Sequence, residues 1–176
     1  MSTMVRPARI DLRTFQQELA SRLATKTAAQ VESSRLGLMC AGTRWLVRLA
    51  DAGEVVALPH IVTVPMTQPW FLGVANIRGN LFSVVDFSSF LGAEPIAAAA
   101  TTRLVLFGAR ACELNAGIVV QRVLGLRNVA ELAPASMPAD AHDWYAQRWM
   151  DDEGNAWQEI DLGKLARSPA FLQVGV

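Results

Sequence analysis

The chain has 176 residues, of which 52% are hydrophobic, and this is enough to bury the core of one domain. Its 16 Lys and Arg residues balance its 16 Asp and Glu residues, which argues against a nucleic-acid-binding protein with a strong positive field. The chain does not begin with a signal-peptide pattern. Cys40 and Cys112 have no neighbouring Cys or His, so we expect both to be small core residues in a reducing cytoplasm.

The first predicted element is an amphipathic helix that begins after Asp11 as N-cap and runs to about Glu32. Its apolar residues recur at steps of three and four, which places them on one stripe of a helix: Leu12, Phe15, Leu19 and Leu23. This stripe packs on the domain's own barrel or docks a partner. We favour packing, because tertiary contacts supply most of the stability of a helix.

From Arg35 onwards the periodicity changes to short β runs that are separated by turn residues. Many short strands with few helices between them predict a mainly β domain. In the first part of the chain, the predicted β runs are 36–41, 44–49, 54–58 and 61–64. Gly42-Thr43 is the predicted turn between the first two runs.

Residues 55–77 carry no charge, which raises the question of a membrane segment. Three prolines and several polar residues interrupt this stretch, and in lipid they would leave backbone groups without hydrogen bonds. We therefore expect no insertion into the membrane.

A tight β-hairpin is predicted where two apolar runs, 71–77 and 81–87, flank Gly79-Asn80. Alternation of side chains along the first arm places Leu72, Val74 and Asn76 on one face of the strand. Asp86, near the end of the second arm, is expected to bond backbone groups where the chain turns.

The second half of the chain continues the β pattern after a surface connection at 92–102. The acidic turn 151–155 is predicted to join the two arms of a further hairpin. The other elements expected here are β runs at 103–110 and 114–126 with a bend or bulge at Gly125, a loop at 134–138, hairpin arms at 143–150 and 156–162, and a helical turn at 162–165.

No constellation of residues indicates catalysis. Asp151, Asp152 and Glu153 lack the ligand spacing of a calcium loop, so we interpret them as a solvated turn. His60 and His142 have no partner at a metal-ligand or nucleophile spacing, and no phosphate-binding loop occurs. We expect a non-enzymatic protein with no catalytic, cofactor-binding or metal-binding residue.

The central segment carries a resemblance to a known family. It reads Pro-Trp-Phe-Leu-Gly-Val-Ala-Asn-Ile-Arg-Gly over 69–79, followed by Val-Val-Asp-Phe at 84–87 and Leu91-Gly92. This ordered pattern resembles the CheW family of chemotaxis coupling proteins, and is most similar to the PilI branch that serves type IV pili and twitching motility. Two positions depart from the family pattern. This chain has Ala52-Gly53-Glu54 where the family usually has Val-x-Glu, and Ser83 where the family often has Pro.

The resemblance implies two intertwined five-stranded SH3-like barrels that share a hydrophobic core, with the N-terminal amphipathic helix as an addition. The corresponding divisions of the chain are an N-terminal extension at 1–34, a CheW-like domain at 35–168 and a C-terminal tail at 169–176.

The resemblance also implies a function. A protein of this family is a cytoplasmic adaptor, associated with membrane receptor arrays, that joins the cytoplasmic tip of a methyl-accepting chemoreceptor to the regulatory domain of a CheA-type histidine kinase. It implies contact roles for Glu54 and Arg78, a turn shaped by Asn76 and Gly79, and an apolar groove bordered by Val55 and Val56. The predicted protein-binding residues are Ala52, Glu54, Val55, Val56, Asn76, Arg78 and Gly79.

An alternative of another class is a small-molecule-sensing β-barrel with a ligand pocket between the two lobes. Polar residues that converge inside this space would favour it, and the sequence shows none. Because Glu54 and Arg78 stand among nearly uncharged apolar strands, we favour the protein-binding surface.

Overall fold

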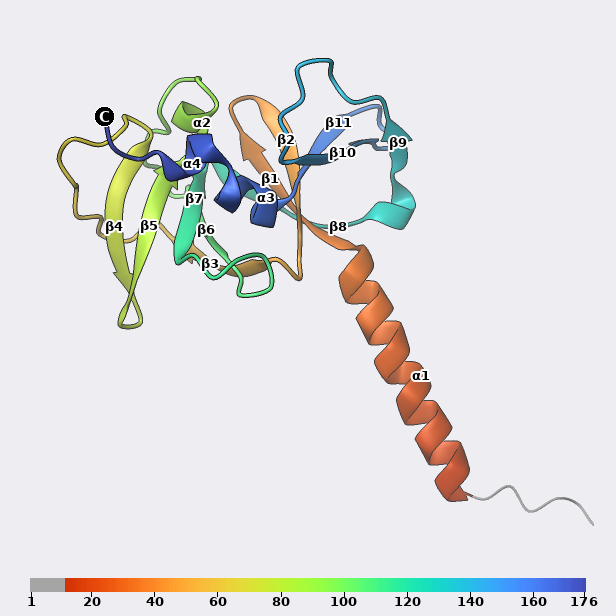
Figure 1. Cartoon of the computed structure of the whole chain (residues 1–176). Coiled ribbons are helices and arrows are strands. Elements are labelled where there is room, and N and C mark those ends of the chain that lie inside the picture. Colours follow the sequence, from red (N-terminus) through yellow and green to blue (C-terminus); the bar gives the residue numbers. More distant parts are fainter. Residues whose placement is uncertain (1–11) are drawn as a thin grey trace, which may run out of the picture. The chain divides into compact units, whose positions relative to one another are not determined.

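The computed structural model describes residues 12–176 and separates the chain into two units, 1–32 and 33–176 (Figure 1). The predicted N-terminal helix is present as α1 (Leu12–Ser33), but its expected N-cap, Asp11, lies outside the described residues. The side chains of its apolar stripe, Leu12, Phe15, Leu19 and Leu23, also lie outside them, so their packing stays a prediction. No helix among the described residues is both long and apolar enough to cross a membrane.

The second unit is built on two β-sheets, one for each of the two lobes that the family resemblance implies (Figure 1). The first sheet has the strand order β8 (Arg122–Asn128), β1 (Ser34–Cys40), β2 (Thr43–Arg48), β11 (Ala156–Ile160), β10 (Tyr145–Met150) and β9 (Ala133–Ala135). The second has the order β3 (Ala52–Ala57), β6 (Arg103–Phe107), β7 (Ala116–Val120), β5 (Asn80–Asp86) and β4 (Phe71–Ile77). The whole second sheet is thus inserted in the chain between β2 and β8, which makes the two lobes intertwined.

Four short helical segments complete this unit. Strand β5 runs directly into α2 (Phe87–Phe90), and the 3-10 turn η1 (Val129–Glu131) follows β8. At the C-terminal end, α3 (Leu162–Arg167) and α4 (Pro169–Leu172) lie in front of the sheets in Figure 1. Phe171 of α4 is buried in the core, so residues beyond 168 contribute to the packing of the domain. The predicted divisions at 34 and 168 stay predictions.

Both predicted hairpins at glycines form, but their turns begin one residue earlier than expected. Ile77 pairs with Asn80 and Cys40 with Thr43, so Arg78-Gly79 and Ala41-Gly42 are the turn residues. All four turn residues have positive φ, the pattern of a type I′ turn, which matches the right-handed twist of the strands. Glycine is favoured at the second turn position, so Asn80 and Thr43 belong to the strands.

Two further expectations about strands are wrong. The segment 134–138 was expected to be a loop, but Ala133–Ala135 forms β9 at the edge of the first sheet, which therefore has six strands. Pro134 is tolerated there because an edge strand leaves one side of its backbone unpaired. The run 61–64 is not a strand and makes only an isolated bridge, between Val62 and Val74.

The faces of β4 also differ from simple alternation. A bulge between Phe71 and Gly73 shifts the register, and Leu72 consequently packs with Ala75 and Ile77 against the second sheet's core instead of sharing a face with Val74. The bulge at Gly125 that the sequence predicts is present opposite Gly37 and Leu38.

One large core is shared by the two sheets. It takes side chains from both sheets and from α2, α3 and α4, among them Leu38, Trp45, Phe87, Ile118, Leu162 and Phe171. Trp45 of the first sheet contacts Phe87 of α2 edge to face, with their ring centroids 5.2 Å apart. A smaller core, which includes Val84, Leu104 and Val119, fills the second lobe. The lobes therefore depend on each other for burial of apolar surface.

Candidate protein-binding surface

The two predicted site charges meet across the second sheet. Glu54 lies on β3 and Arg78 at the β4–β5 turn, and β3 and β4 are the opposite edge strands of that sheet. Nη2 of Arg78 nevertheless donates a hydrogen bond to Oε1 of Glu54 at 2.7 Å. The sheet must therefore curl until its edges approach each other, as in a barrel. Sequence reasoning did not establish this contact, because 24 residues separate the pair.

The turn that presents Arg78 is held by its own side chains. Arg78 has φ of 53° and Gly79 has φ of 86°, both in the left-handed region. The side-chain oxygen of Asn76 accepts a hydrogen bond from the backbone N–H of Gly79 at 2.9 Å. For a residue with a Cβ, this left-handed conformation costs free energy, and it persists only where the surrounding structure holds it. At Arg78 the hairpin and the ion pair together hold the backbone.

The ion pair itself adds little to folding stability. The side chain of Arg78 is 78% exposed and that of Glu54 is 39% exposed. Pairs so open to solvent contribute about 0.2–1 kcal/mol, because water screens the attraction. Arginine has five N–H donors, so Arg78 keeps donors for a further carboxylate while Glu54 orients it.

The remaining predicted site residues flank Glu54 on β3. Val55 is 37% exposed, whereas Val56 packs against the core of the second lobe. Ala52, at the start of β3, packs against the shared core. Of these three side chains, Val55 offers apolar surface beside Glu54.

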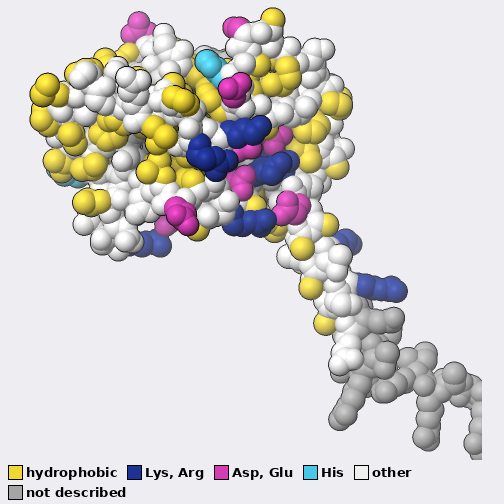
Figure 2. All heavy atoms as spheres, in the orientation of Figure 1, with side chains coloured by type: hydrophobic (Ala, Val, Ile, Leu, Met, Phe, Trp, Pro, Cys, Tyr) yellow, Lys and Arg dark blue, Asp and Glu magenta, His cyan; other side chains and the backbone are white. Residues whose placement is uncertain are grey.

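Exposed apolar side chains are also found near the hairpin. Figure 2 shows hydrophobic side chains spread over the part of the surface around β4 and β5, and Lys and Arg side chains mixed with Asp and Glu over α3. Val62, which bridges to β4, is 57% exposed and Leu81 of β5 is 62% exposed. Exposed apolar residues beside an oriented charge are typical of a protein-binding surface.

Asp86 has the local role that the sequence predicts. It is buried at the N-cap of α2, where Oδ1 accepts from the backbone N–H of Ser89 and Oδ2 from that of Ile96. Asp86 therefore joins the end of β5 to α2 and to the following connection.

The acidic turn joins β10 and β11, as the sequence predicts, and it is held by its own hydrogen bonds. Among the described residues, no group of side chains that could hold a metal ion is found. Asp151 accepts hydrogen bonds from the indole of Trp157 at 2.9 Å and from the backbone of Asn155 at 2.7 Å. These bonds, with that from Trp157 as the largest cause, lower the pKa of Asp151 from 3.8 to about 2.

We expect this lowered pKa to make stability depend on pH in the acid range. A carboxyl whose pKa is lower in the folded state stabilises the fold above pH 3.8 and loses this effect as the pH falls toward 2. Urea unfolding is compared at about pH 6, above both pKa values of Asp151, and at about pH 2.5, which lies between them. The stability difference between wild type and Asp151→Asn should shrink at the lower pH. An equal difference at both values would contradict this assignment.

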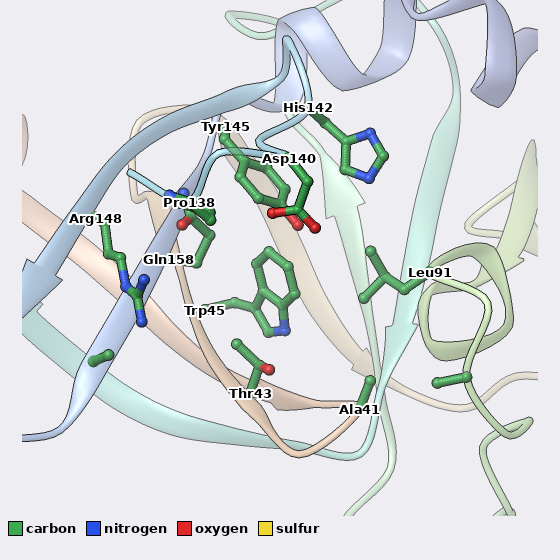
Figure 3. Close-up of a pocket in the computed structure, with 12 residues that line it drawn as sticks. Ala41, Thr43, Trp45, Leu91, Pro138, Asp140, His142, Tyr145, Arg148 and Gln158 are labelled. Atoms are coloured by element: carbon green, nitrogen blue, oxygen red, sulfur yellow. The ribbon is translucent and has the colours of Figure 1, made fainter. Parts of the chain in front are cut away.

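A pocket of about 480 Å³ lies where the first sheet meets the segment after α2 (Figure 3). Its lining combines aromatic and polar side chains, including Trp45, Asp140, His142, Tyr145, Arg148 and Gln158. These polar residues converge in the first lobe, a grouping that the sequence did not show. The signal was missed because these residues come from three separate segments.

The fold and the site together define a two-lobed β domain whose exposed corner presents an oriented arginine on a hairpin. The chain belongs to the CheW-like domain family, whose model matches residues 35–170. Protein PilI of Pseudomonas aeruginosa is 30% identical over 111 residues, a match that spans 61% of this chain and 61% of PilI. The resemblance to the CheW family and to PilI is thereby confirmed.

A solved structure supports the fold. The scaffolding protein TtCheW from Thermoanaerobacter tengcongensis superposes with a TM-score of 0.67 over 82% of this chain and 99% of that chain, at 17% sequence identity. The predicted mainly β, CheW-like fold class is therefore confirmed.

Proposed function

We propose that this chain is a non-enzymatic adaptor that couples a methyl-accepting chemoreceptor to a CheA-type histidine kinase, in a chemosensory pathway for type IV pili and twitching motility. Membership of the CheW-like family and similarity to PilI and to a scaffolding protein support the proposal. The adaptor acts in the cytoplasm, at the membrane arrays where its receptors gather.

The observation that carries the proposal is the Arg78–Glu54 pair. It adds little to folding stability and is held at an exposed corner by the turn and by Asn76. A fixed guanidinium with spare donors recognises a carboxylate with defined geometry and orders few side chains on binding. Ala52, Val55 and Val56 belong to the same proposed surface, with Val55 as the exposed apolar contact beside the pair.

Modest contacts suit such a protein. An array places many copies of the adaptor, receptor and kinase side by side, so that weak interfaces act together. Each interface then needs specificity more than high affinity, and an oriented arginine supplies specificity.

We expect Arg78→Ala to weaken binding to the regulatory domain of the kinase, or to the receptor tip, by at least about tenfold, the effect of losing an interface residue worth more than about 1.4 kcal/mol. Thermal stability should change little, because the exposed pair contributes about 0.2–1 kcal/mol. Size-exclusion co-elution followed by calorimetric titration measures the binding, and a melting curve measures the stability.

Arg122→Ala is the matched control, because Arg122 is also an exposed arginine but lies on β8 of the other sheet. It should bind as the wild type does. If Arg78→Ala binds both partners with unchanged affinity, the Arg78 surface is not the docking surface. If the folded wild type binds neither partner, the coupling function itself is wrong.

A further inference from the structure

The floor of the pocket in the first lobe is a row of three side chains. Arg148 of β10 pairs with Gln158 of β11, and Gln158 pairs with Trp45 of β2. Directly opposed residues on neighbouring strands project from the same face of a sheet. Figure 3 shows the result, with Gln158 between Arg148 and the Trp45 ring.

Gln158 presents a hydrogen-bond acceptor to the pocket. The residue is only 6% exposed, and its side-chain nitrogen donates to the carbonyls of Gln147 at 3.1 Å and Glu159 at 3.2 Å. These two bonds fix the orientation of the amide and leave its oxygen as an acceptor. Among the side chains that the structure describes, no buried N or O atom lacks a hydrogen-bond partner, and no bond to the Gln158 oxygen is present. This oxygen is therefore not fully buried, and Gln158 lines the pocket.

Two opposite charges line the pocket without neutralising each other. Arg148 lies on one side of Pro138, and Asp140 lies on the other, with its carboxylate directed toward Trp45 (Figure 3). The three ion pairs of the described residues include neither of them. Burial, and then the negative charge of Asp140, raise the pKa of Tyr145, which lines the same pocket.

Apolar surface lies between and beside these charges. Trp45 forms the floor, Tyr145 the wall behind Asp140, and Leu91 and Ala41 the opposite side (Figure 3). The His142 ring stacks on Trp144 with centroids 4.9 Å apart, which holds the rim in place. At about 480 Å³ the pocket falls within the size range of small-molecule sites.

We propose that this pocket binds a small zwitterion, an α-amino acid with an apolar side chain. Its carboxylate is held by the guanidinium of Arg148, and its ammonium group by the Asp140 carboxylate and the Gln158 oxygen. Its side chain lies on Trp45 and Leu91. The inference goes beyond the coupling function and does not depend on it, because Glu54 and Arg78 belong to the other sheet.

The test uses the single tyrosine of the chain. Protein labelled with 3-fluorotyrosine gives one ¹⁹F resonance, that of Tyr145 in the pocket wall. The labelled protein is titrated with each apolar amino acid from alanine to phenylalanine. At least one of them should shift this resonance until the shift saturates. For leucine, the matched probes are 4-methylpentanoate and 3-methylbutylamine, which each lack one of the two charges, and corresponding analogues serve for the other amino acids.

Each analogue should bind at least about tenfold more weakly than its amino acid, because one charge-assisted contact is lost. Arg148→Gln and Asp140→Asn should weaken binding of the amino acid by a similar factor, while Arg122→Gln, outside the pocket, leaves it unchanged. Melting curves establish that the variants are folded. The proposal is overturned if no apolar amino acid shifts the resonance at millimolar concentration, if an analogue binds as tightly as its amino acid, or if Arg148→Gln has no effect.

Discussion

Replacing Glu159 by alanine should destabilise the fold by about 3–5 kcal/mol, the cost of breaking a buried ion pair by removing one partner. Glu159 is 3% exposed, and its Oε1 accepts from Nε of Arg35 at 2.7 Å. Its Oε2 accepts from the indole of Trp149, also at 2.7 Å. Alanine would remove the carboxylate with which the guanidinium of Arg35, a residue that is only 7% exposed, pairs at 2.7 Å.

Urea unfolding at neutral pH measures this effect. The exposed Glu113→Ala is the control, and a surface substitution of this kind should stay within about 0.5 kcal/mol of wild type. A double substitution of Arg35 and Glu159 by methionine should recover much of the loss, because it removes both charges. A loss below about 1 kcal/mol for Glu159→Ala would show that the pair is not essential.

Gly73→Ala should destabilise the fold by about 2–4 kcal/mol, through backbone strain and the loss of two backbone hydrogen bonds. Gly73 has φ of 132°, and a Cβ there would lie 2.1 Å from the carbonyl oxygen of Val62. Val62 and Val74 exchange two backbone hydrogen bonds, of 2.8 and 2.9 Å, just beside this point. The methyl group would have to push the 61–64 segment away from β4.

Gly175→Ala is the matched control, because a Cβ at Gly175 meets nothing within 4 Å. It should leave the melting temperature nearly unchanged. Hydrogen exchange adds a local measurement, since the amides of Val62 and Val74 should lose protection in Gly73→Ala. Unchanged protection of these amides would mean that the backbone accommodates the methyl group at Gly73.

The sequence by itself determined the elements whose signals are local. Turn glycines between apolar runs predicted the hairpins at 40–43 and 77–80, and the stretch around Arg78 indicated the family. The turns were misplaced by one residue because either Ala41 or Thr43 can accompany Gly42, and only the pairing of the strands decides. Asp86 at a strand end predicted its own capping role.

The tertiary structure alone decided which distant residues meet. Arg78 reaches Glu54 because the second sheet curls edge to edge. Leu72 changes face because β4 carries a bulge. Strand β9 forms because it pairs with β10 at the edge of the first sheet. The pocket joins Trp45, Asp140 and Gln158 through a sheet that brings β2 beside β11, far apart in the chain. Side-chain periodicity fixes a face of one strand, whereas strand order and barrel closure depend on the burial of the whole core.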